Sequence, residues 1–290
     1  MDSTFSEPFR RIFRLNGLDR LAVGPAVARF RHLTVLLTEA NARFNLTAIR
    51  DLPGIIARHY ADSLLAEPLF PRRARVLDIG CGGGFPCLPL ALARPDLRIT
   101  ALDSTQKKLD FVQHAAEALE LKHFRTICAR AESRTLRELY EEFDVVTGRA
   151  VARLNILAEL AMPFLRTGGL LIAYKGAQGS EELAEAAHAL QVLGGGEAQD
   201  LPMRLVLPPE CQTVPAKVPA AAQAGEIPAK APATGESRAA TAENSAAQED
   251  TEAPGAAEAT ESRHILVIPK ERPTPPQYPR AYAAILKQPL

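Results

Sequence analysis

The sequence predicts an α/β protein with a doubly wound, mostly parallel, Rossmann-like sheet and an N-terminal helical extension. Three observations support this. From residue 74 to residue 193, short apolar strands alternate with amphipathic helices, the pattern of a parallel sheet. The first strand runs into four glycines within residues 80–84, and a helix follows them. Before the sheet, residues 20–44 repeat their apolar side chains at helical intervals.

The N-terminal extension, residues 1–70, is expected to be helical. Apolar side chains recur three or four positions apart over 20–44, and a second helix is expected over 53–69, with Pro53 near its start. The first residues carry charges and Pro8 where a signal peptide needs an apolar core, so secretion is not expected.

The core, residues 71–210, is expected to alternate strands and helices. The expected strands are 75–80, 98–103, 124–129, 143–148 and 170–176. The expected helices are 86–93, 107–119, 153–165 and 180–193, with a short helix between the third and fourth strands. Two more strands, near 201–207 and at 264–269, would extend one edge of the sheet.

A low-complexity segment interrupts this pattern. Of the 48 residues from 215 to 262, 17 are alanine, 5 are proline and none is aromatic. Such a stretch cannot bury enough apolar area to offset its ordering entropy. We therefore expect a disordered insertion over 211–262, with its two flanking strands paired at the sheet edge. Residues 263–290 would supply the final strand and a basic, proline-rich tail.

Composition narrows the class of protein. The 34 basic and 34 acidic residues cancel, yet residues 1–75 carry 12 basic and 7 acidic side chains, a net of +5. Residues 263–290 carry 5 and 1, a net of +4, so a basic face for a polyanion stays open. No apolar run approaches the ~18 residues of a membrane span. The four cysteines show no metal or disulfide spacing. We expect a cytoplasmic monomer without metal or membrane partner.

The strongest chemical signal is the segment LDIGCGGGFPCLPL at 77–90. Glycines at 80, 82 and 84 allow a ligand to approach the backbone at the carboxyl end of a strand. A dinucleotide fingerprint would need glycine at 85, where Phe85 stands. The pattern instead resembles the cofactor loop of S-adenosylmethionine-dependent methyltransferases. Asp103 ends the second strand, where it could accept both ribose hydroxyls of an adenosine or cap the following helix.

Later strand ends add further candidates. Glu132, in the loop after the third strand, either reads an adenine edge or is a solvated acid. Arg149 ends the fourth strand and could bind a phosphate, the cofactor carboxylate or a base edge. Lys175, at the end of the fifth strand, would project toward the same cleft. His59 and Asp62 share one helix face, either as a helix anchor or as substrate contacts. Cys87 is interpreted as packing.

Taken together, these segments resemble one family, the bacterial ribosomal RNA small-subunit methyltransferase G family, also called glucose-inhibited division protein B. The matching pieces are N-L-T-A-I-R-D (45–51), R-H-Y-A-D-S-L (58–64), L-D-I-G-C-G-G-G-F-P (77–86), A-L-D-S (101–104), A-E (131–132), G-R-A (148–150), Y-K-G (174–176) and P-T-P-P-Q-Y-P-R (273–280). The likeness runs in order along nearly the whole chain outside 211–262.

The resemblance implies S-adenosylmethionine-dependent methylation of N7 of one guanine in 16S ribosomal RNA, free or in the small-subunit particle. It places the family's cofactor contacts on five positions, with Asp103 and Ser104 beside the ribose. Those five are Gly80, Phe85, Ala131, Glu132 and Arg149. Guanine N7 carries a free lone pair, so no general base is expected, and the candidates near the base are Arg149, Lys175 and His59. A small-molecule methyltransferase and a non-catalytic cofactor-binding module are the competing classes.

Overall fold

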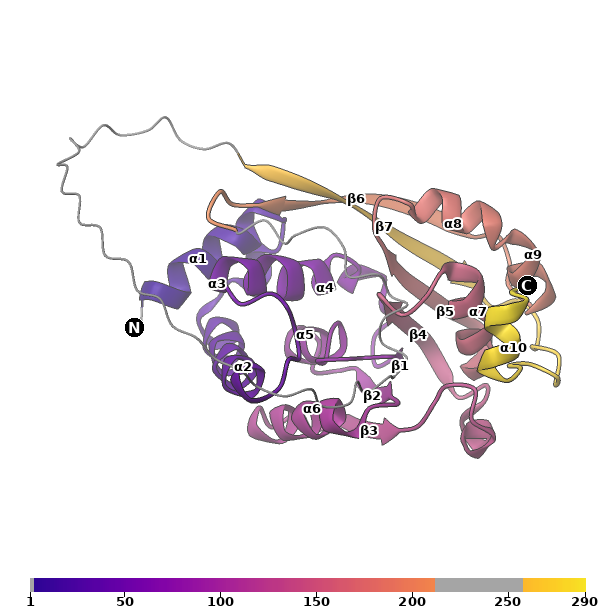
Figure 1. Ribbon diagram of the computed structural model, residues 1–290. Helices are drawn as coiled ribbons and strands as arrows, with labels where there is room; N and C mark the ends of the chain where they lie inside the picture. The colour runs from indigo at the N-terminus through magenta and orange to yellow at the C-terminus, as the bar shows by residue number, and fades with distance from the viewer. Residues whose placement is uncertain (1–2, 212–257) are drawn as a thin grey trace, which may run out of the picture.

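The computed structural model describes residues 3–211 and 258–290, and within them seven strands form one sheet with helices on both faces (Figure 1). The strand order is β3-β2-β1-β4-β5-β7-β6. Strands β1 to β5 are parallel, and β7 runs antiparallel to both β5 and β6. The order reverses between β1 and β4, the point at which open α/β sheets bind ligands. The predicted fold class is confirmed.

The strands lie close to the ranges expected from the sequence. They are β1 (Arg75–Ile79), β2 (Arg98–Asp103), β3 (Phe124–Cys128), β4 (Phe143–Arg149), β5 (Leu165–Lys175), β6 (Gln199–Leu207) and β7 (Ala259–Pro269). Residues 259–262 were expected in the insertion but belong to β7, because they pair with residues 204–207 of β6. The rest of the expected insertion, 212–257, lies outside the described residues.

The helices follow the expected alternation, with shorter pieces than predicted. They are α1 (Ser3–Leu15), α2 (Gly24–Arg43), α3 (Leu52–Gly54), α4 (Asp62–Leu64), α5 (Cys87–Ala93), α6 (Gln106–Ala118), α7 (Leu154–Ala161), α8 (Gly179–Glu185), α9 (Ala187–Val192) and α10 (Tyr282–Lys287). Short 3₁₀ segments are η1 (Asp19–Leu21), η3 (Glu67–Leu69), η4 (Arg134–Leu139) and η5 (Met162–Phe164), and η2 (Ile55–Ala61) is a π-helix. The single helix expected over 180–193 is therefore two helices, α8 and α9.

The core has two halves, one on each face of the sheet. Neighbouring strand residues such as Val76 and Leu77 point to opposite faces, because side chains alternate along a strand. Val76 belongs to the half that packs against α1, α2, α5 and α6, whereas Leu77 belongs to the half beneath α7 and α9. Because both faces are covered, the strands read as continuous apolar runs.

The N-terminal extension is attached by aromatic packing. Helix α1 lies within the extension expected to be helical, although its bounds were not predicted, and it buries its phenylalanines completely or nearly so. Phe9 lies 5.2 Å from Phe30 of α2 between ring centroids, and Phe30 lies 5.1 Å from Tyr60. Aromatic pairs at such separations add to the stabilisation from buried area. The extension is thus fixed to the face of the sheet that carries α5 and α6.

Residues 52–64 form a continuous helical stretch with a π-helical centre, in place of the plain helix expected over 53–69. A π turn is uncommon and often marks a functional site, because it changes which side chains share a face. Here it carries Arg58 and His59, and Asp62 follows immediately. This stretch therefore brings three polar side chains toward the ends of β4 and β7.

The strands on either side of the expected insertion pair with each other. β6 and β7 run antiparallel from Gln199 opposite Val267 to Leu207 opposite Ala259. This confirms the expectation that the two strands are neighbours at the sheet edge, and Figure 1 shows the hairpin reaching toward α1.

Candidate functional site

The polar residues singled out from the sequence gather at one edge of the sheet. β1, β2 and β4 end at Ile79, Asp103 and Arg149, and these three strands are parallel neighbours. The glycine loop therefore lies between Asp103 and Arg149. Ala131 and Glu132 follow β3, next along the same edge, and Ser104 stands exposed beside Asp103.

The glycine loop needs its glycines for two different reasons. Gly82 and Gly84 both have positive φ, +55° and +88°. A Cβ on Gly84 would collide with Leu88 of the following helix, so this glycine permits close packing inside the protein. A Cβ on Gly82 would meet only a backbone oxygen 3.9 Å away, so this glycine faces open space. The open side of the loop is where a ligand can approach the backbone.

Asp103 fixes this loop to the end of β2. Its Oδ2 accepts a hydrogen bond from the backbone N–H of Gly82 at 2.9 Å, and its Oδ1 accepts one from Thr105 at 2.8 Å. An ionised carboxylate has about four acceptor sites, so two are taken and two remain. The helix that follows, α6, has Thr105 as its N-cap residue. Asp103 thus organises the loop while keeping acceptor capacity for donors of a ligand.

Beneath the loop lies a buried carboxyl group, Asp78. It accepts hydrogen bonds from Thr147 Oγ1 at 3.1 Å and from the backbone N–H of Cys87 at 3.3 Å. Burial is the main cause that raises its pKa to about 7. Cys87 itself is fully buried, which agrees with its interpretation as a packing residue. Asp78 therefore joins β1, β4 and the start of α5 rather than facing a substrate.

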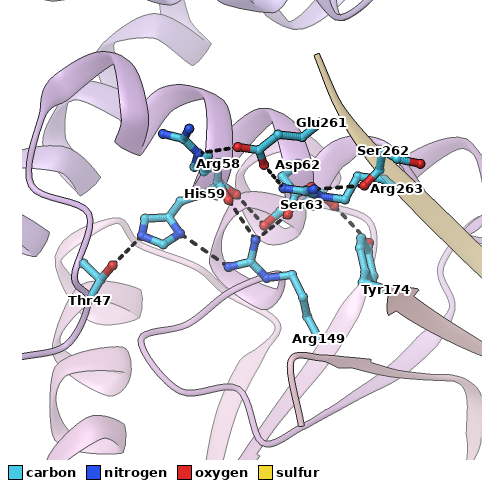
Figure 2. A network of polar contacts seen from close by, with 10 residues as sticks. All are labelled: Thr47, Arg58, His59, Asp62, Ser63, Arg149, Tyr174, Glu261, Ser262 and Arg263. Carbon is cyan, nitrogen blue, oxygen red and sulfur yellow. Dashed lines mark hydrogen bonds and ion pairs between the residues drawn. The ribbon is translucent and has the colours of Figure 1, made fainter. Parts of the chain in front are cut away.

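Arg149 is held in place by the helical stretch (Figure 2). Its Nη1 donates to Asp62 Oδ2 at 2.7 Å and to the carbonyl oxygen of Arg58 at 2.9 Å. Its Nη2 lies 3.4 Å from His59 Nδ1. Three of the five N–H donors of the guanidinium are thereby engaged, so two remain for a ligand. A phosphate, the cofactor carboxylate or a base edge was expected to bind Arg149. The structure shows that the carboxylate of Asp62 also binds it.

His59 is a buried, neutral imidazole. Its ring stacks on Phe85, with centroids 4.3 Å apart and an angle of 7° between the planes. Burial first, then the charges of Arg149 and Arg58, lower its pKa to about 3. Because Arg149 donates toward Nδ1, the proton belongs on Nε2, which lies 2.8 Å from Thr47 Oγ1. This arrangement favours the anchor interpretation of His59 over direct substrate contact.

The C-terminal strand completes the network with residues that the sequence analysis missed. Arg263 donates to the second oxygen of Asp62 at 2.6 Å, and Glu261 pairs with both Arg263 and Arg58. Glu261 had been placed in the insertion. Tyr174 of β5 donates to the carbonyl of Ser63 at 2.9 Å. Residues 259–264 carry no apolar alternation that would mark a strand, and only the apolar run that follows them was visible in the sequence.

The side chains of Lys175 and Phe85 are less accessible to a ligand than their positions in the sequence suggested. The Lys175 ammonium donates to the carbonyl of Ala152 at 2.6 Å and pairs with Glu182 of α8 at 2.7 Å. Phe85 as a whole is 6% exposed, and its ring contacts His59 and Arg149, so little of its side chain is accessible to a ligand. Ala131 is buried and Glu132 half-buried.

No described helix has the length and apolar character needed to cross a bilayer. Nor do residues 3–211 and 258–290 bring together three or more His, Cys, Asp or Glu side chains in a way that could hold a metal ion.

Comparison with known proteins matches residues 26–203 to the family model described as rRNA small subunit methyltransferase G. A protein named ribosomal RNA small subunit methyltransferase G from Deinococcus deserti is 49% identical over 182 residues, which are 62% of this chain and 73% of that protein. The protein of the same name from Halalkalibacterium halodurans is 35% identical over 265 residues, 90% of each chain.

Among solved structures, precorrin-6y C5,15-methyltransferase from Geobacter metallireducens covers 79% of this chain and 92% of its own, with a TM-score of 0.46 and 12% identity. The strand order described above, rather than this superposition, defines the fold.

Proposed function

Since the chain belongs to the ribosomal RNA small subunit methyltransferase G family, we propose that it methylates N7 of one guanine of 16S ribosomal RNA, guanine 527 in the family. The observation that supports this most directly is the convergence of the open glycine loop, Asp103 and Arg149 at the switch point of the sheet.

The residues at this edge fit S-adenosylmethionine. The open space over Gly82 leaves room for the cofactor beside the loop backbone, and the two free acceptor sites of Asp103 suit the two ribose hydroxyls. We assign Gly80, Gly82, Gly84 and Phe85 to the loop that holds it. Ser104 lies beside the ribose and Ala131–Glu132 beside the adenine, as the family resemblance implies.

The reaction requires the guanine and the methyl group to be positioned, rather than a proton to be transferred. S-adenosylmethionine, when bound, supplies a methyl group activated by a positively charged sulfur. The lone pair of guanine N7 is free at neutral pH, so the protein needs no general base, and orientation supplies most of the acceleration. Arg149 is suited to orientation because Asp62 and the Arg58 carbonyl fix its guanidinium while two N–H donors stay free. Those donors can bind guanine O6 or the cofactor carboxylate.

We further propose that the chain acts as a cytoplasmic monomer on 16S rRNA, either free or in the small-subunit particle. In support, only three large hydrophobic side chains, Val23, Val35 and Leu286, are exposed among the described residues, and they lie on separate helices or separate turns. A stable interface usually needs a contiguous apolar patch. Sedimentation velocity of the purified protein at several concentrations tests the monomer.

The decisive experiment transfers methyl groups from labelled S-adenosylmethionine to ribosomal RNA from a bacterial strain that lacks the family's enzyme. Label in 16S rRNA, recovered as 7-methylguanosine at a single position, is the expected result. Label at a different atom or only in small metabolites would overturn the proposal. Tight cofactor binding without any transfer would identify a binding module instead.

A further inference from the structure

A groove separate from the glycine loop lies between the segment after β3 and the C-terminal segment. One wall consists of Glu132, Arg134, Arg137 and Tyr140, and the other consists of residues 276–282. Its volume is about 460 Å³, which falls within the roughly 300–1,000 Å³ of typical ligand sites. Apart from Glu132, none of these residues has a part in the site described above.

The C-terminal wall is firmly docked. Arg280 holds Glu159 of α7 through its backbone N–H at 2.9 Å, Nε at 2.8 Å and Nη2 at 2.6 Å, and Glu159 is fully buried. Upstream, the buried Lys270 donates to Thr274. Downstream, Ile285 of α10 is fully buried in the core half beneath α7 (Figure 1). The wall is therefore a fixed surface rather than a loose tail.

The opposite wall presents two unpaired cations on a rigid turn. Leu136 of η4 is buried, and Tyr140 packs edge-on against Phe164 at 5.1 Å and 89°. A 3₁₀ helix has three residues per turn, so Arg134 and Arg137 project from the same side. Both are exposed, and among the described residues neither takes part in an ion pair.

The lining combines positive charge with aromatic rings. Glu132 is its one acidic residue, and Glu159 already offsets the charge of Arg280. Three half-buried tyrosines, Tyr140, Tyr278 and Tyr282, line the same groove. Cations that follow a phosphate backbone, next to rings on which bases stack, are what single-stranded nucleic acid requires. A small anionic metabolite would not need three tyrosines.

We propose that this groove binds a single-stranded stretch of ribosomal RNA next to the target guanine. Arg134 and Arg137 would contact phosphates, and Tyr278 or Tyr282 would stack on a base. Glu132 belongs both to this lining and to the loop assigned to the adenine, so the groove is continuous with the reaction edge of the sheet. The inference rests on the proposed function, because it names where the same substrate is held.

The test compares two doubly substituted proteins of equal charge. Arg134→Gln with Arg137→Gln removes the unpaired cations of the groove. Arg72→Gln with Arg98→Gln removes two exposed arginines at the opposite, amino-terminal edge of the sheet. Binding of a labelled single-stranded RNA that contains the target guanine is measured at several salt concentrations, and cofactor binding is measured by calorimetry.

We expect the groove variant to bind the RNA about tenfold more weakly, with cofactor affinity unchanged. Its salt slope should fall by about 1.4, since each phosphate contact on a single strand contributes about 0.7. The control variant should keep the slope of the unsubstituted protein. Tyr282→Leu should weaken binding without changing the slope, because stacking releases no counterions. In methylation assays the groove variant should raise KM for RNA and preserve kcat.

Equal RNA binding by the groove and control variants would overturn the inference. So would a defect of the groove variant that is seen only with the ribosomal particle and not with naked RNA, since the groove would then hold a ribosomal protein. These outcomes are distinct from failure of the proposed function, which would appear as an absence of methyl transfer by the unsubstituted protein. In either case, the RNA-binding measurement tests whether the groove binds single-stranded RNA.

Discussion

The carboxylate of Asp103 accepts a hydrogen bond from the backbone N–H of Gly82 at 2.9 Å, so the end of β2 fixes the middle of the loop that follows β1. The two residues are 21 positions apart. Their contact keeps the open side of the loop and the free oxygen lone pairs of Asp103 on one surface. A cofactor that binds there meets a loop whose shape is already set, which lowers the entropic cost of binding.

Gly82→Val should abolish cofactor binding while the protein stays folded. Valine strains the positive φ of this position and also fills the open side of the loop. We expect calorimetry to show at least about a 100-fold loss of S-adenosylmethionine affinity, or about 2.7 kcal/mol. Gly17→Val is a matched control, because Gly17 has φ +69° and also faces open space, in the turn after α1. Equal affinity in the two variants would contradict the assignment.

Asp62→Asn should destabilise the protein by about 2 kcal/mol, because it leaves Arg149 and Arg263 partly buried without their shared charge. The estimate is modest because both arginines keep some contact with water. Urea unfolding measures the change. In Asp19→Asn, which breaks an exposed pair with Arg14, the loss should stay below about 0.5 kcal/mol. If the two substitutions cost the same, the network does not stabilise the fold.

His59 should remain neutral well below the usual pKa of histidine, and this makes stability depend on pH. Its folded pKa is about 3, against 6.5 for an ordinary histidine. The unfolded chain therefore binds a proton between pH 6.5 and pH 3 that the folded protein does not bind. Stability from this group is present above pH 6.5 and is lost as the pH falls toward 3.

The measurement is the difference in unfolding free energy between the unsubstituted protein and His59→Gln. We expect this difference to fall by about 2 kcal/mol from pH 7 to pH 5. Asp78 acts in the opposite sense, because its raised pKa of about 7 stabilises the fold at low pH, but both proteins share it and its effect cancels. An NMR titration of His59 with a midpoint near 6.5 would show that the imidazole is not protected.

The sequence predicted the elements whose periodicity is local. Strands such as Arg98–Asp103 combine an apolar run with a clear end, and the structure places β2 at those residues. No separate helix was assigned to the residues of α1, although Phe5, Phe9 and Ile12 recur at helical spacing, because Pro8 and the nearby charges were weighed only against a signal peptide. Burial of the phenylalanines against α2 outweighs the cost of that proline.

Site residues could be placed from the sequence only where they stand at the end of a predicted strand. The ends of β1, β2 and β4 must meet at one edge, so Asp103 and Arg149 could be placed together in advance. The ion pairs of Asp62 could not, because Arg149 is 87 residues away and Arg263 is 201 residues away. No local pattern encodes a contact of that separation. Lys175 shows the same limit, since its partner Glu182 comes from the next helix.

Replacing residues 212–257 by four glycines should preserve both the melting temperature and the activity. Leu207 already pairs with Ala259, so a short turn can join the strands. Closing a shorter loop also costs less, by about 0.6 kcal/mol for each halving of length.

The residue at which the deletion ends affects the expected result. A deletion of 211–262, the whole insertion expected from composition, also removes the start of β7 together with Glu261, which pairs with Arg58 and Arg263. We expect that longer deletion to lower the melting temperature and the turnover, as measured by differential scanning calorimetry and methyl transfer. If the shorter deletion is equally damaging, the removed residues support the fold, and the expectation drawn from their composition is wrong.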